Sequence, residues 1–254
     1  MSATAVLLAG SRPGGDRLAQ QFGLRVKALI RVGGKPMIGR PLSALKASKA
    51  IGQIRVLSQD VEALRTAVGR AKSVRLQRSE GTIASTLLAL MFDKSIQWPL
   101  VVTTADHALL ERVMVDQLLT DADGADVAVA VVEQTALMQR LPQTRRTWLK
   151  FRNGAYTGAN LFVFGSPKAA AAIEIWRSVE QDRKKGWRMI AALGPMTLIG
   201  TALRLLTIDQ TAARLGRKLG LNVRIVRMAD PLAGIDVEKL DDLKLVEAIV
   251  AGRA

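Results

Sequence analysis

Short runs of valine, leucine and isoleucine alternate along most of this chain with stretches whose apolar residues recur at helical spacing. The predicted strands span residues 4–9, 53–58, 73–77, 99–104, 126–132, 159–164 and 222–228, and the predicted helices span 36–48, 60–69, 81–93 and 109–121. Such alternation is typical of an α/β fold with a mostly parallel sheet flanked by helices. Ligands of these sheets bind beyond the carboxyl ends of the strands. We therefore expect the loops after residues 9, 104 and 164 to face one crevice.

The stretch before the last predicted strand differs, because residues 166–219 have a helical pattern throughout. We expect a helical insertion there, within a single domain that spans residues 1–254. A basic segment at residues 183–188 leaves two interpretations open. Its cations are either solvated on a packed helix, or they form a lid or docking surface for an anionic acceptor or membrane lipid. Residues 237–251 are expected to form a closing amphipathic helix.

The chain carries 37 lysines and arginines against 22 acidic residues, a formal net charge of +15. This excess attracts anions, which include nucleotides, phosphorylated metabolites, nucleic acid and acidic membrane surfaces. The basic residues are scattered and aromatic residues make up only 4% of the chain, so no basic segment is interleaved with stacking aromatics. This pattern disfavours a nucleic-acid partner. Nucleotides and phosphorylated small molecules remain the expected ligands, with peripheral contact to an anionic membrane left open.

The chain contains no cysteine and a single histidine, His107. Disulfides, a thiolate metal site, a cysteine nucleophile and a multi-histidine zinc centre are thereby excluded. A metal site in this chain must be built from oxygen ligands, which favours Mg²⁺ or Mn²⁺.

The N-terminal apolar stretch does not have the pattern of a secretory signal. It is short, lacks a basic leading segment and ends in a glycine loop. No uninterrupted apolar run reaches the ~18 residues of a membrane-spanning helix. We therefore expect a cytoplasmic protein.

A glycine-rich, cation-rich loop follows the first predicted strand. The apolar run ends in Ala9-Gly10, and two arginines, an aspartate and the pair Gly14-Gly15 follow. Glycine at this place lets backbone N–H groups approach phosphate oxygens. The P-loop pattern fails, since residue 29 is leucine instead of glycine and residue 36 is proline instead of serine or threonine; the dinucleotide pattern fails because Ser-Arg-Pro-Gly-Gly follows Gly10. The loop is a phosphate-binding candidate of another type.

Two segments, VLLAGSRPGGDR and KALIRVGGKPMIGRPLSAL, resemble the signature of the nucleotidyltransferase superfamily, L-A-G-G-x-x-x-R followed by K-x-L-x-x-V-x-G-K-P-M-I. Three further segments, VVTTADHALL, YTGANLFVF and GIDVEKLDDLKLVE, resemble later parts of that superfamily in the right order. The superfamily includes molybdenum-cofactor guanylyltransferase-like NTP transferases, sugar-phosphate nucleotidyltransferases and methylerythritol-phosphate cytidylyltransferases. This chain departs from the signature at Ser11, where the second glycine stands, and in its longer spacing to Lys27.

The resemblance implies a Rossmann-like sheet of the GT-A type and a Mg²⁺-dependent enzyme. Members of the superfamily attach NMP to a phosphorylated acceptor and release pyrophosphate. Fixed cations and a metal suit this reaction, because the acceptor and the triphosphate repel each other and charge builds on the leaving group. CTP and GTP are the favoured nucleotides, and the acceptor is expected to be a sugar, polyol or other small alcohol phosphate.

The matched motifs also assign roles to individual residues. By resemblance, Arg12 and Lys27 are the catalytic cations, Leu8, Ala9, Gly10, Ser11, Gly81 and Ser85 bind the nucleotide, and Asp106 and Asp236 hold the metal. Arg17 remains an alternative to Arg12 as the phosphate-binding arginine.

Structural alternatives stand beside several of these roles. Aspartate is a good helix cap, so Asp106 alternatively caps the helix predicted from residue 109. Ser79 alternatively caps the helix that contains Ser85, which would then be a plain helix terminus. Lys35-Pro36 more simply opens a helix, and His107 is favoured as a hydrogen-bonded neighbour of the site.

Five cations precede Tyr156-Thr157-Gly158, namely Arg140, Arg145, Arg146, Lys150 and Arg152. The fork of an arginine side chain matches phosphate oxygens, so a phosphorylated acceptor is expected here. The predicted acceptor-binding residues are Arg145, Arg146, Lys150, Thr157, Gly158 and Asn160. The alternative is a solvated basic hairpin.

Three other functions are alternatives to the transferase. A glycosyltransferase of the same sheet architecture uses an activated donor and an Asp-x-Asp metal motif, but this chain has Ala105-Asp106-His107-Ala108. The other two are a non-catalytic nucleotide-sensing domain and a nucleic-acid-binding protein. The joint presence of Arg12, Lys27, Asp106 and Asp236 favours the transferase. The base, the acceptor and the oligomeric state stay open.

Overall fold

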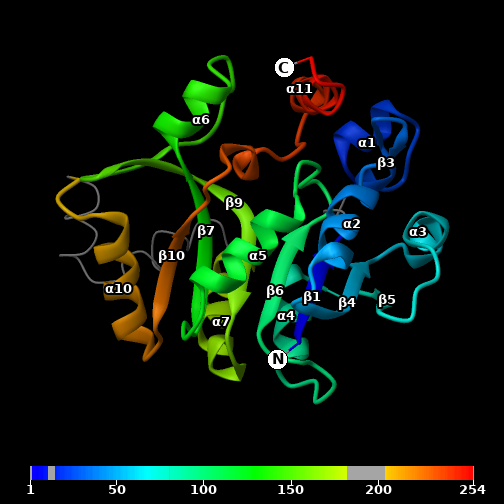
Figure 1. Ribbon diagram of the computed structural model, residues 1–254. Coiled ribbons are helices and arrows are strands. Elements are labelled where there is room, and N and C mark those ends of the chain that lie inside the picture. Colours follow the sequence, from blue (N-terminus) through cyan, green and yellow to red (C-terminus); the bar gives the residue numbers. More distant parts are fainter. Residues whose placement is uncertain (1, 11–14, 80, 182–203, 254) are drawn as a thin grey trace.

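A computed structural model describes residues 2–10, 15–79, 81–181 and 204–253 of the chain. The strands of its main sheet are β1 (Ala3–Leu8), β4 (Ile51–Ser58), β5 (Val74–Arg78), β6 (Leu100–Thr104), β7 (Val127–Glu133), β8 (Leu149–Phe151), β9 (Gly154–Phe164) and β10 (Val223–Arg227). Within the described residues this sheet has eight strands in the order β10-β7-β9-β6-β1-β4-β5, with β8 pairing beside β9 (Figure 1). The pairs β1–β4, β1–β6, β4–β5 and β7–β10 are parallel, which confirms the predicted mostly parallel, Rossmann-like sheet.

Helices cover both faces of this sheet (Figure 1). The longer ones are α2 (Gly39–Ala47), α3 (Val61–Val68), α4 (Ile83–Met91), α5 (Arg112–Asp121), α7 (Ala170–Gln181), α10 (Ile208–Leu219) and α11 (Leu240–Val250). Successive side chains of a strand point to opposite faces. In the central strand β1, Ala5 and Leu7 therefore enter the core with α2, α3 and α5, whereas Val6 enters the core with α4 and α7. The unbroken apolar run of β1 is explained by burial on both faces.

The direction of β9 corrects one expectation. This strand runs antiparallel to β6 and β7, and Phe164 at its carboxyl end pairs with Leu100 and Val127, the first residues of those strands. The loop after residue 164 therefore lies at the sheet edge opposite the predicted crevice. The first half of β9 lies at the crevice instead, and this half was not predicted as strand because Gly154 and Gly158 interrupt its apolar pattern.

The segment Gly33-Gly34-Lys35-Pro36 forms a hairpin and not a helix start. Gly33 and Gly34 have φ angles of +58° and +78° and join the short strands β2 (Arg31–Val32) and β3 (Lys35–Pro36). Two consecutive residues with positive φ are typical of a type I′ turn, which glycine adopts without a steric penalty. The expectation that Lys35-Pro36 opens a helix is therefore wrong, and α2 begins three residues later, at Gly39.

The predicted helical region at residues 166–219 is mostly helical where the structure describes it, apart from residues 204–207 before α10. It contains the 3₁₀ turn η2 (Pro167–Ala169), α7 and α10, and α10 packs on β10. The basic segment at residues 183–188 lies outside the described residues. The expected closing helix is α11, whereas α6 (Gln134–Arg140) was not predicted as an element. The β8–β9 hairpin corresponds to the basic hairpin that was the alternative interpretation of its segment. No helix in the described ranges has the length and apolar character needed to cross a bilayer.

Candidate functional site

The loop after β1 begins at the carboxyl edge of the sheet. Leu8 ends the strand, Ala9 is buried with its N–H bonded to the Leu57 carbonyl at 2.8 Å, and Gly10 is exposed. A Cβ at Gly10 would lie 2.6 Å from Gln59 Oε1, so glycine leaves room for that side chain. The predicted residues Ser11 and Arg12 lie outside the described residues. The alternative arginine, Arg17, is the first residue of α1 (Arg17–Gln21) and is exposed.

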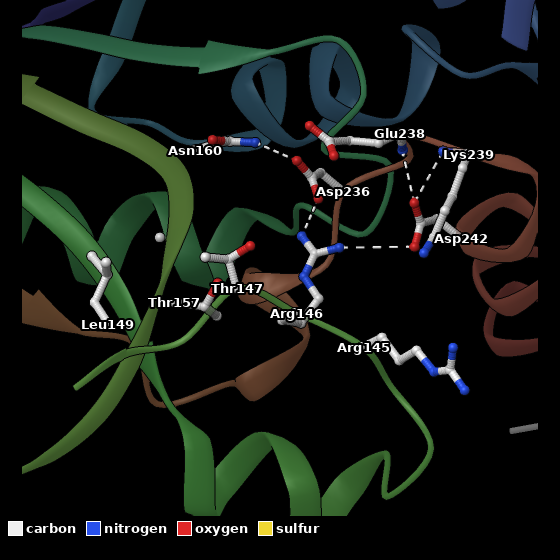
Figure 2. Close-up of a pocket in the computed structure, with 11 residues that line it drawn as sticks. Arg145, Arg146, Thr147, Leu149, Thr157, Asn160, Asp236, Glu238, Lys239 and Asp242 are labelled. Atoms are coloured by element: carbon white, nitrogen blue, oxygen red, sulfur yellow. Dashed lines mark hydrogen bonds and ion pairs between the residues drawn. The ribbon is translucent and has the colours of Figure 1, made fainter. Parts of the chain in front are cut away.

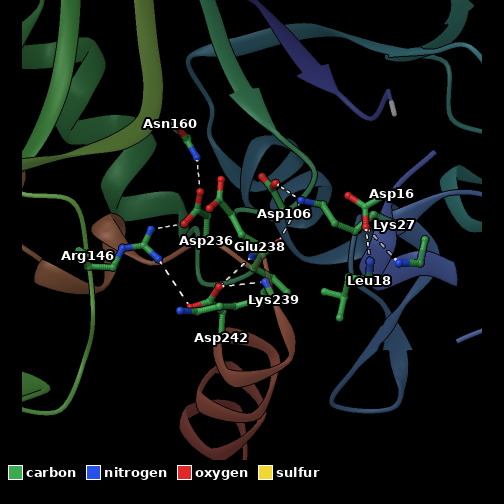
Figure 3. A network of polar contacts seen from close by, with 12 residues as sticks. Asp16, Leu18, Lys27, Asp106, Arg146, Asn160, Asp236, Glu238, Lys239 and Asp242 are labelled. Atoms are coloured by element: carbon green, nitrogen blue, oxygen red, sulfur yellow. Dashed lines mark hydrogen bonds and ion pairs between the residues drawn. The ribbon is translucent and has the colours of Figure 1, made fainter. Parts of the chain in front are cut away.

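Lys27 joins three segments of the chain at this edge (Figure 3). It lies in the 3₁₀ turn η1 (Lys27–Leu29), and its Nζ donates to Asp106 Oδ2 at 2.6 Å and to the Val237 carbonyl at 3.0 Å. The Val237 N–H in turn donates to the Asp106 carbonyl at 3.0 Å. Both charged side chains are mostly buried, with exposed fractions of 19% for Lys27 and 17% for Asp106. Because Asp236 precedes Val237 directly, the two predicted metal ligands come from adjacent backbone segments.

Asp106 does not cap a helix. Helix α5 begins at Arg112 with Glu111 as its N-cap residue, so the alternative role for Asp106 is wrong. Asp106 lies instead in the turn after β6, and its Oδ1 is buried without a hydrogen-bond partner in the described part of the chain. A buried carboxylate oxygen without a partner is costly unless a ligand completes it.

Asp236 is held from two sides (Figure 3). It follows the 3₁₀ turn η3 (Pro231–Gly234), its Oδ2 accepts from Asn160 Nδ2 at 2.7 Å, and its Oδ1 accepts from Arg146. Arg146 Nη1 also lies 3.9 Å from Asp242 Oδ1. Asp242 Oδ2 accepts from the backbone N–H groups of Glu238 and Lys239, which fixes the start of α11.

The backbone of Asn160 departs from ordinary strand geometry. Its φ is +47°, and the register between β7 and β9 shifts between Val129 and Val131. A positive φ is sterically costly for most residues, and asparagine tolerates it better than others. Strained residues of this kind cluster at functional sites. Here the irregular strand presents the Asn160 amide to Asp236, which supports a role for this residue in shaping the site.

A pocket of about 560 Å³ lies next to Asp236 (Figure 2). It is lined by Arg145, Arg146, Thr147, Leu149, Thr157, Gly158, Asn160, Asp236, Glu238, Lys239 and Asp242. Five of the six predicted acceptor-binding residues are brought together here. The sixth, Lys150, does not line the pocket, because it lies in β8 next to Leu149 and alternate residues of a strand point to opposite faces. The pocket also contains residues that were not predicted from sequence, namely Thr147, Leu149, Glu238, Lys239 and Asp242.

The predicted base-reading residues lie where β5 leads into α4. Gly81 has a φ of +77°, a conformation that favours glycine. Thr82 is the N-cap of α4, and Ser85 Oγ accepts from the Thr82 N–H at 2.9 Å, which completes a capping box. Ser79 is not the cap, because its Oγ pairs with Thr86 Oγ1 at 2.9 Å. Recognition of the base by Gly81 and Ser85 stays a prediction.

His107, next to Asp106 in the chain, is completely buried. Its Nδ1 lies 3.3 Å from Thr103 Oγ1. Burial lowers the pKa of His107 to about 4, although the charges of Asp106 and Asp236 oppose this shift. The ring is therefore neutral at neutral pH.

This shift predicts a pH dependence of stability for the protein in chelator. Between the unfolded pKa of 6.5 and the folded pKa of about 4, the unfolded chain binds a proton that the folded chain does not. The unfolding free energy should therefore fall as pH is lowered through that window, by about 3 kcal/mol from this residue. His107→Gln should remove this part of the slope, as measured by urea unfolding at several pH values. Equal slopes in both proteins would contradict the prediction.

The chemistry of these donors fits Mg²⁺. All candidate ligands are carboxylate oxygens, and Asp106 Oδ1 is available. The described residues contain no group of three or more histidine, cysteine or acidic side chains that could hold a metal by themselves. Asp106 and Asp236 would therefore supply two ligands and leave the other positions to triphosphate oxygens and water.

A family model described as the MobA-like NTP transferase domain matches residues 5–207. The chain belongs to this family. It is accordingly a nucleotidyltransferase, as its motifs predicted. The matched residues include Lys27, Asp106 and the pocket residues up to Asn160, whereas Asp236 lies beyond them.

Several solved structures are similar to this chain. A hypothetical transferase from Thermus thermophilus is 26% identical, with a TM-score of 0.81 over 96% of this chain and 100% of that one. CMP:2-keto-3-deoxy-manno-octonic acid synthetase, solved with CTP, is 15% identical, with a TM-score of 0.63 over 100% of both chains. The 2-C-methyl-D-erythritol 4-phosphate cytidylyltransferase of Thermus thermophilus is 16% identical, with a TM-score of 0.53 over 99% and 100%. The last two share the fold with this nucleotidyltransferase. No curated protein matches its sequence.

Proposed function

We propose that this nucleotidyltransferase moves NMP from an NTP to a small phosphorylated acceptor and releases pyrophosphate, with Mg²⁺ or Mn²⁺ as cofactor. The observation that carries the proposal is the position of Lys27, Asp106 and Asp236. They lie between the loop after β1, where the nucleotide is expected, and the pocket that Arg145 and Arg146 line.

The proposed reaction is one displacement at phosphorus. A phosphate oxygen of the acceptor attacks the α-phosphorus, and the bond from this phosphorus to the oxygen that bridges to the β-phosphate breaks. Pyrophosphate leaves with the electron pair. No proton has to move, because the acceptor phosphate is already ionised. A bound Mg²⁺ would offset the charge of the triphosphate oxygens.

Lys27 is placed to stabilise this transfer. Its ammonium group is fixed by Asp106 and by the Val237 carbonyl before any substrate binds. A cation held in advance costs no reorganisation when charge develops on the transferred phosphoryl group. Its third N–H remains for an α-phosphate oxygen.

The pocket supplies two further cations for the acceptor. Arg145 points away from the Asp236–Asp242 cluster in Figure 2. Lys239 lies at the start of α11, on the same pocket wall. Thr147 and Thr157 add hydroxyl groups, which suit the hydroxyls of a sugar or polyol phosphate. CTP is the first nucleotide to test, because two structures of the same fold are named for CTP or for cytidylyl transfer.

Gly158 allows a test of the acceptor pocket that does not disturb the fold. A Cβ built on Gly158 meets no atom within 4 Å, and the residue lines the pocket. Gly158→Ala should leave the unfolding free energy unchanged or raise it by less than about 1 kcal/mol. The methyl group occupies acceptor space, so the KM for the acceptor should rise about tenfold while the KM for the NTP is unchanged. Gly39→Ala is the matched control, since its Cβ also meets nothing and it lies outside the pocket. An unchanged acceptor KM would contradict this placement.

Calorimetric titration of the four NTPs, each with and without Mg²⁺, tests the nucleotide part of the proposal. We expect one NTP to bind, with an affinity that falls when Mg²⁺ is withheld and falls again in Asp106→Asn. Binding of a nucleotide-sugar in place of any NTP would favour a glycosyltransferase. NTP binding without turnover on any acceptor would favour a sensing domain. Binding to nucleic acid with a steep salt dependence, and to no NTP, would favour the nucleic-acid alternative.

A further inference from the structure

Arg146 occupies a central position among the acidic residues of the site. Its guanidinium contacts Asp236 Oδ1 and lies 3.9 Å from Asp242 Oδ1 (Figures 2 and 3). The three side chains are buried to a similar degree, with exposed fractions of 11% for Arg146 and 12% for each aspartate. Asp236 Oδ2 is taken by Asn160. Both oxygens of the second predicted metal ligand are therefore engaged by protein donors.

The two predicted metal ligands differ in this respect. Asp106 shares only Oδ2 with Lys27, and its Oδ1 has no partner among the described residues. A cation that approaches the pair meets an available oxygen on Asp106 but a guanidinium on Asp236. On Asp106 a metal and Lys27 would use different oxygens, whereas both oxygens of Asp236 already accept from protein donors. A cation at Asp236 would be repelled more strongly by the Arg146 guanidinium than by the neutral Asn160 amide. Metal binding to Asp236 and the Arg146–Asp236 ion pair are therefore competing states.

We infer that Arg146 is a positioning residue that exchanges between Asp236 and the acceptor phosphate. This inference rests on the proposed function. When a divalent cation binds at Asp236, Arg146 loses that partner and keeps Asp242 on its other side. Its free fork then faces the pocket that it already lines. An acceptor phosphate is the bidentate partner that such a fork fits. Release of Arg146 from Asp236 would thus prepare the acceptor site, which predicts ordered binding with metal and NTP first.

Arg145 provides the matched comparison. It directly precedes Arg146 in the chain and lines the same pocket, but it is exposed and contacts neither Asp236 nor Asp242. Arg145 is expected to bind phosphate whether or not a metal is present. Arg146 is expected to bind phosphate only after the metal has released it from Asp236.

Two binding measurements that need no turnover test this exchange. The first is Mn²⁺ binding to the protein alone, followed by the electron paramagnetic resonance signal of free Mn²⁺. Arg146→Gln should bind Mn²⁺ about tenfold more tightly than the unchanged protein, whereas Arg145→Gln should bind it equally. The second is calorimetric binding of methyl phosphate. Arg145→Gln should weaken it with and without Mg²⁺, and Arg146→Gln should weaken it only with Mg²⁺.

Arg146→Gln leaves Asp236 and Asp242 without their cation and therefore carries a risk of misfolding. A second variant provides an independent test. Arg146→Lys keeps a charge but cannot reach both aspartates with one planar fork. It should show a smaller tightening of Mn²⁺ binding. Unfolding by urea in the presence of Mn²⁺ should show a larger metal-dependent stabilisation for either variant than for the unchanged protein.

The measurements distinguish a failure of the Arg146 exchange from a failure of the proposed function. If Asp106→Asn weakens Mn²⁺ binding but neither Arg146 variant changes it, the exchange is overturned and the proposed function stands. If Mn²⁺ binding is insensitive to Asp106→Asn as well, the metal site is overturned and the exchange falls with it. Tighter Mn²⁺ binding in Arg146→Gln, together with metal-dependent loss of methyl phosphate binding, supports the exchange.

Discussion

Asp106→Asn should lower kcat/KM for nucleotidyl transfer by about 10³-fold, because it removes the carboxylate with a buried, available oxygen at the centre of the site. The substitution is isosteric. Its amide oxygen can still accept from Lys27 Nζ, and the Asp106 backbone carbonyl still accepts from the Val237 N–H. The variant should therefore remain folded, and the loss should appear in the reaction rate. A pyrophosphate-release assay at saturating Mg²⁺ measures it.

Asp123→Asn is the control for this substitution. It makes the same chemical change at an exposed position after α5, away from the crevice. Its kcat/KM should equal that of the unchanged enzyme. More than a tenth of the original activity in Asp106→Asn would exclude Asp106 as a metal ligand.

Lys27→Met should reduce both stability and activity. The side chain that remains is apolar, so Asp106 is left as a mostly buried carboxylate without its cation, and the Val237 carbonyl loses a donor. Removal of one partner of a buried ion pair costs about 3 kcal/mol. The rate should fall by about 10²-fold or more, because the fixed positive charge near the α-phosphate is lost. Urea unfolding and the pyrophosphate assay measure the two effects.

The double variant Lys27→Met with Asp106→Asn separates the two causes. If the instability of Lys27→Met comes from the unpaired carboxylate, the second substitution should recover part of the lost unfolding free energy. Activity should not recover. Additive losses of stability would show that the Lys27–Asp106 pair is not coupled and that packing of the lysine chain is responsible.

The parts of the fold that local pattern determines were predicted well. The strand β1, the helices on both faces and the turn that carries Asp106 follow from apolar runs and their spacing. The direction of β9 was not predictable in this way, because an apolar run carries no information on whether its neighbours are parallel. Because β9 is antiparallel, its first half lies at the crevice and carries Thr157, Gly158 and Asn160. A parallel strand would have had its last residues there instead.

In the site, too, residues within motifs were predicted, whereas contacts that depend on the tertiary arrangement were not. Lys27, Asp106 and Asp236 were predicted from motifs, and the structure brings them together. Arg146 was predicted to bind the acceptor, but its present contact with Asp236 spans 90 positions of sequence, and no spacing rule links residues that far apart. The hairpin register decides that Leu149 and not Lys150 lines the pocket. Glu238 and Lys239 line the pocket at the start of α11, where their backbone N–H groups donate to Asp242 Oδ2. No sequence motif indicates this contact.

The most direct test of the central claim is a transfer assay that detects both products. The enzyme is incubated with CTP or GTP, Mg²⁺ and a panel of sugar and polyol phosphates; pyrophosphate is quantified, and mass spectrometry searches for the nucleotidylated acceptor. We predict pyrophosphate and nucleotidylated product in equal amounts, with one NTP, only when a phosphorylated acceptor and Mg²⁺ are both present. Pyrophosphate release that is independent of the acceptor, or product formation that persists in Asp106→Asn, would contradict the account.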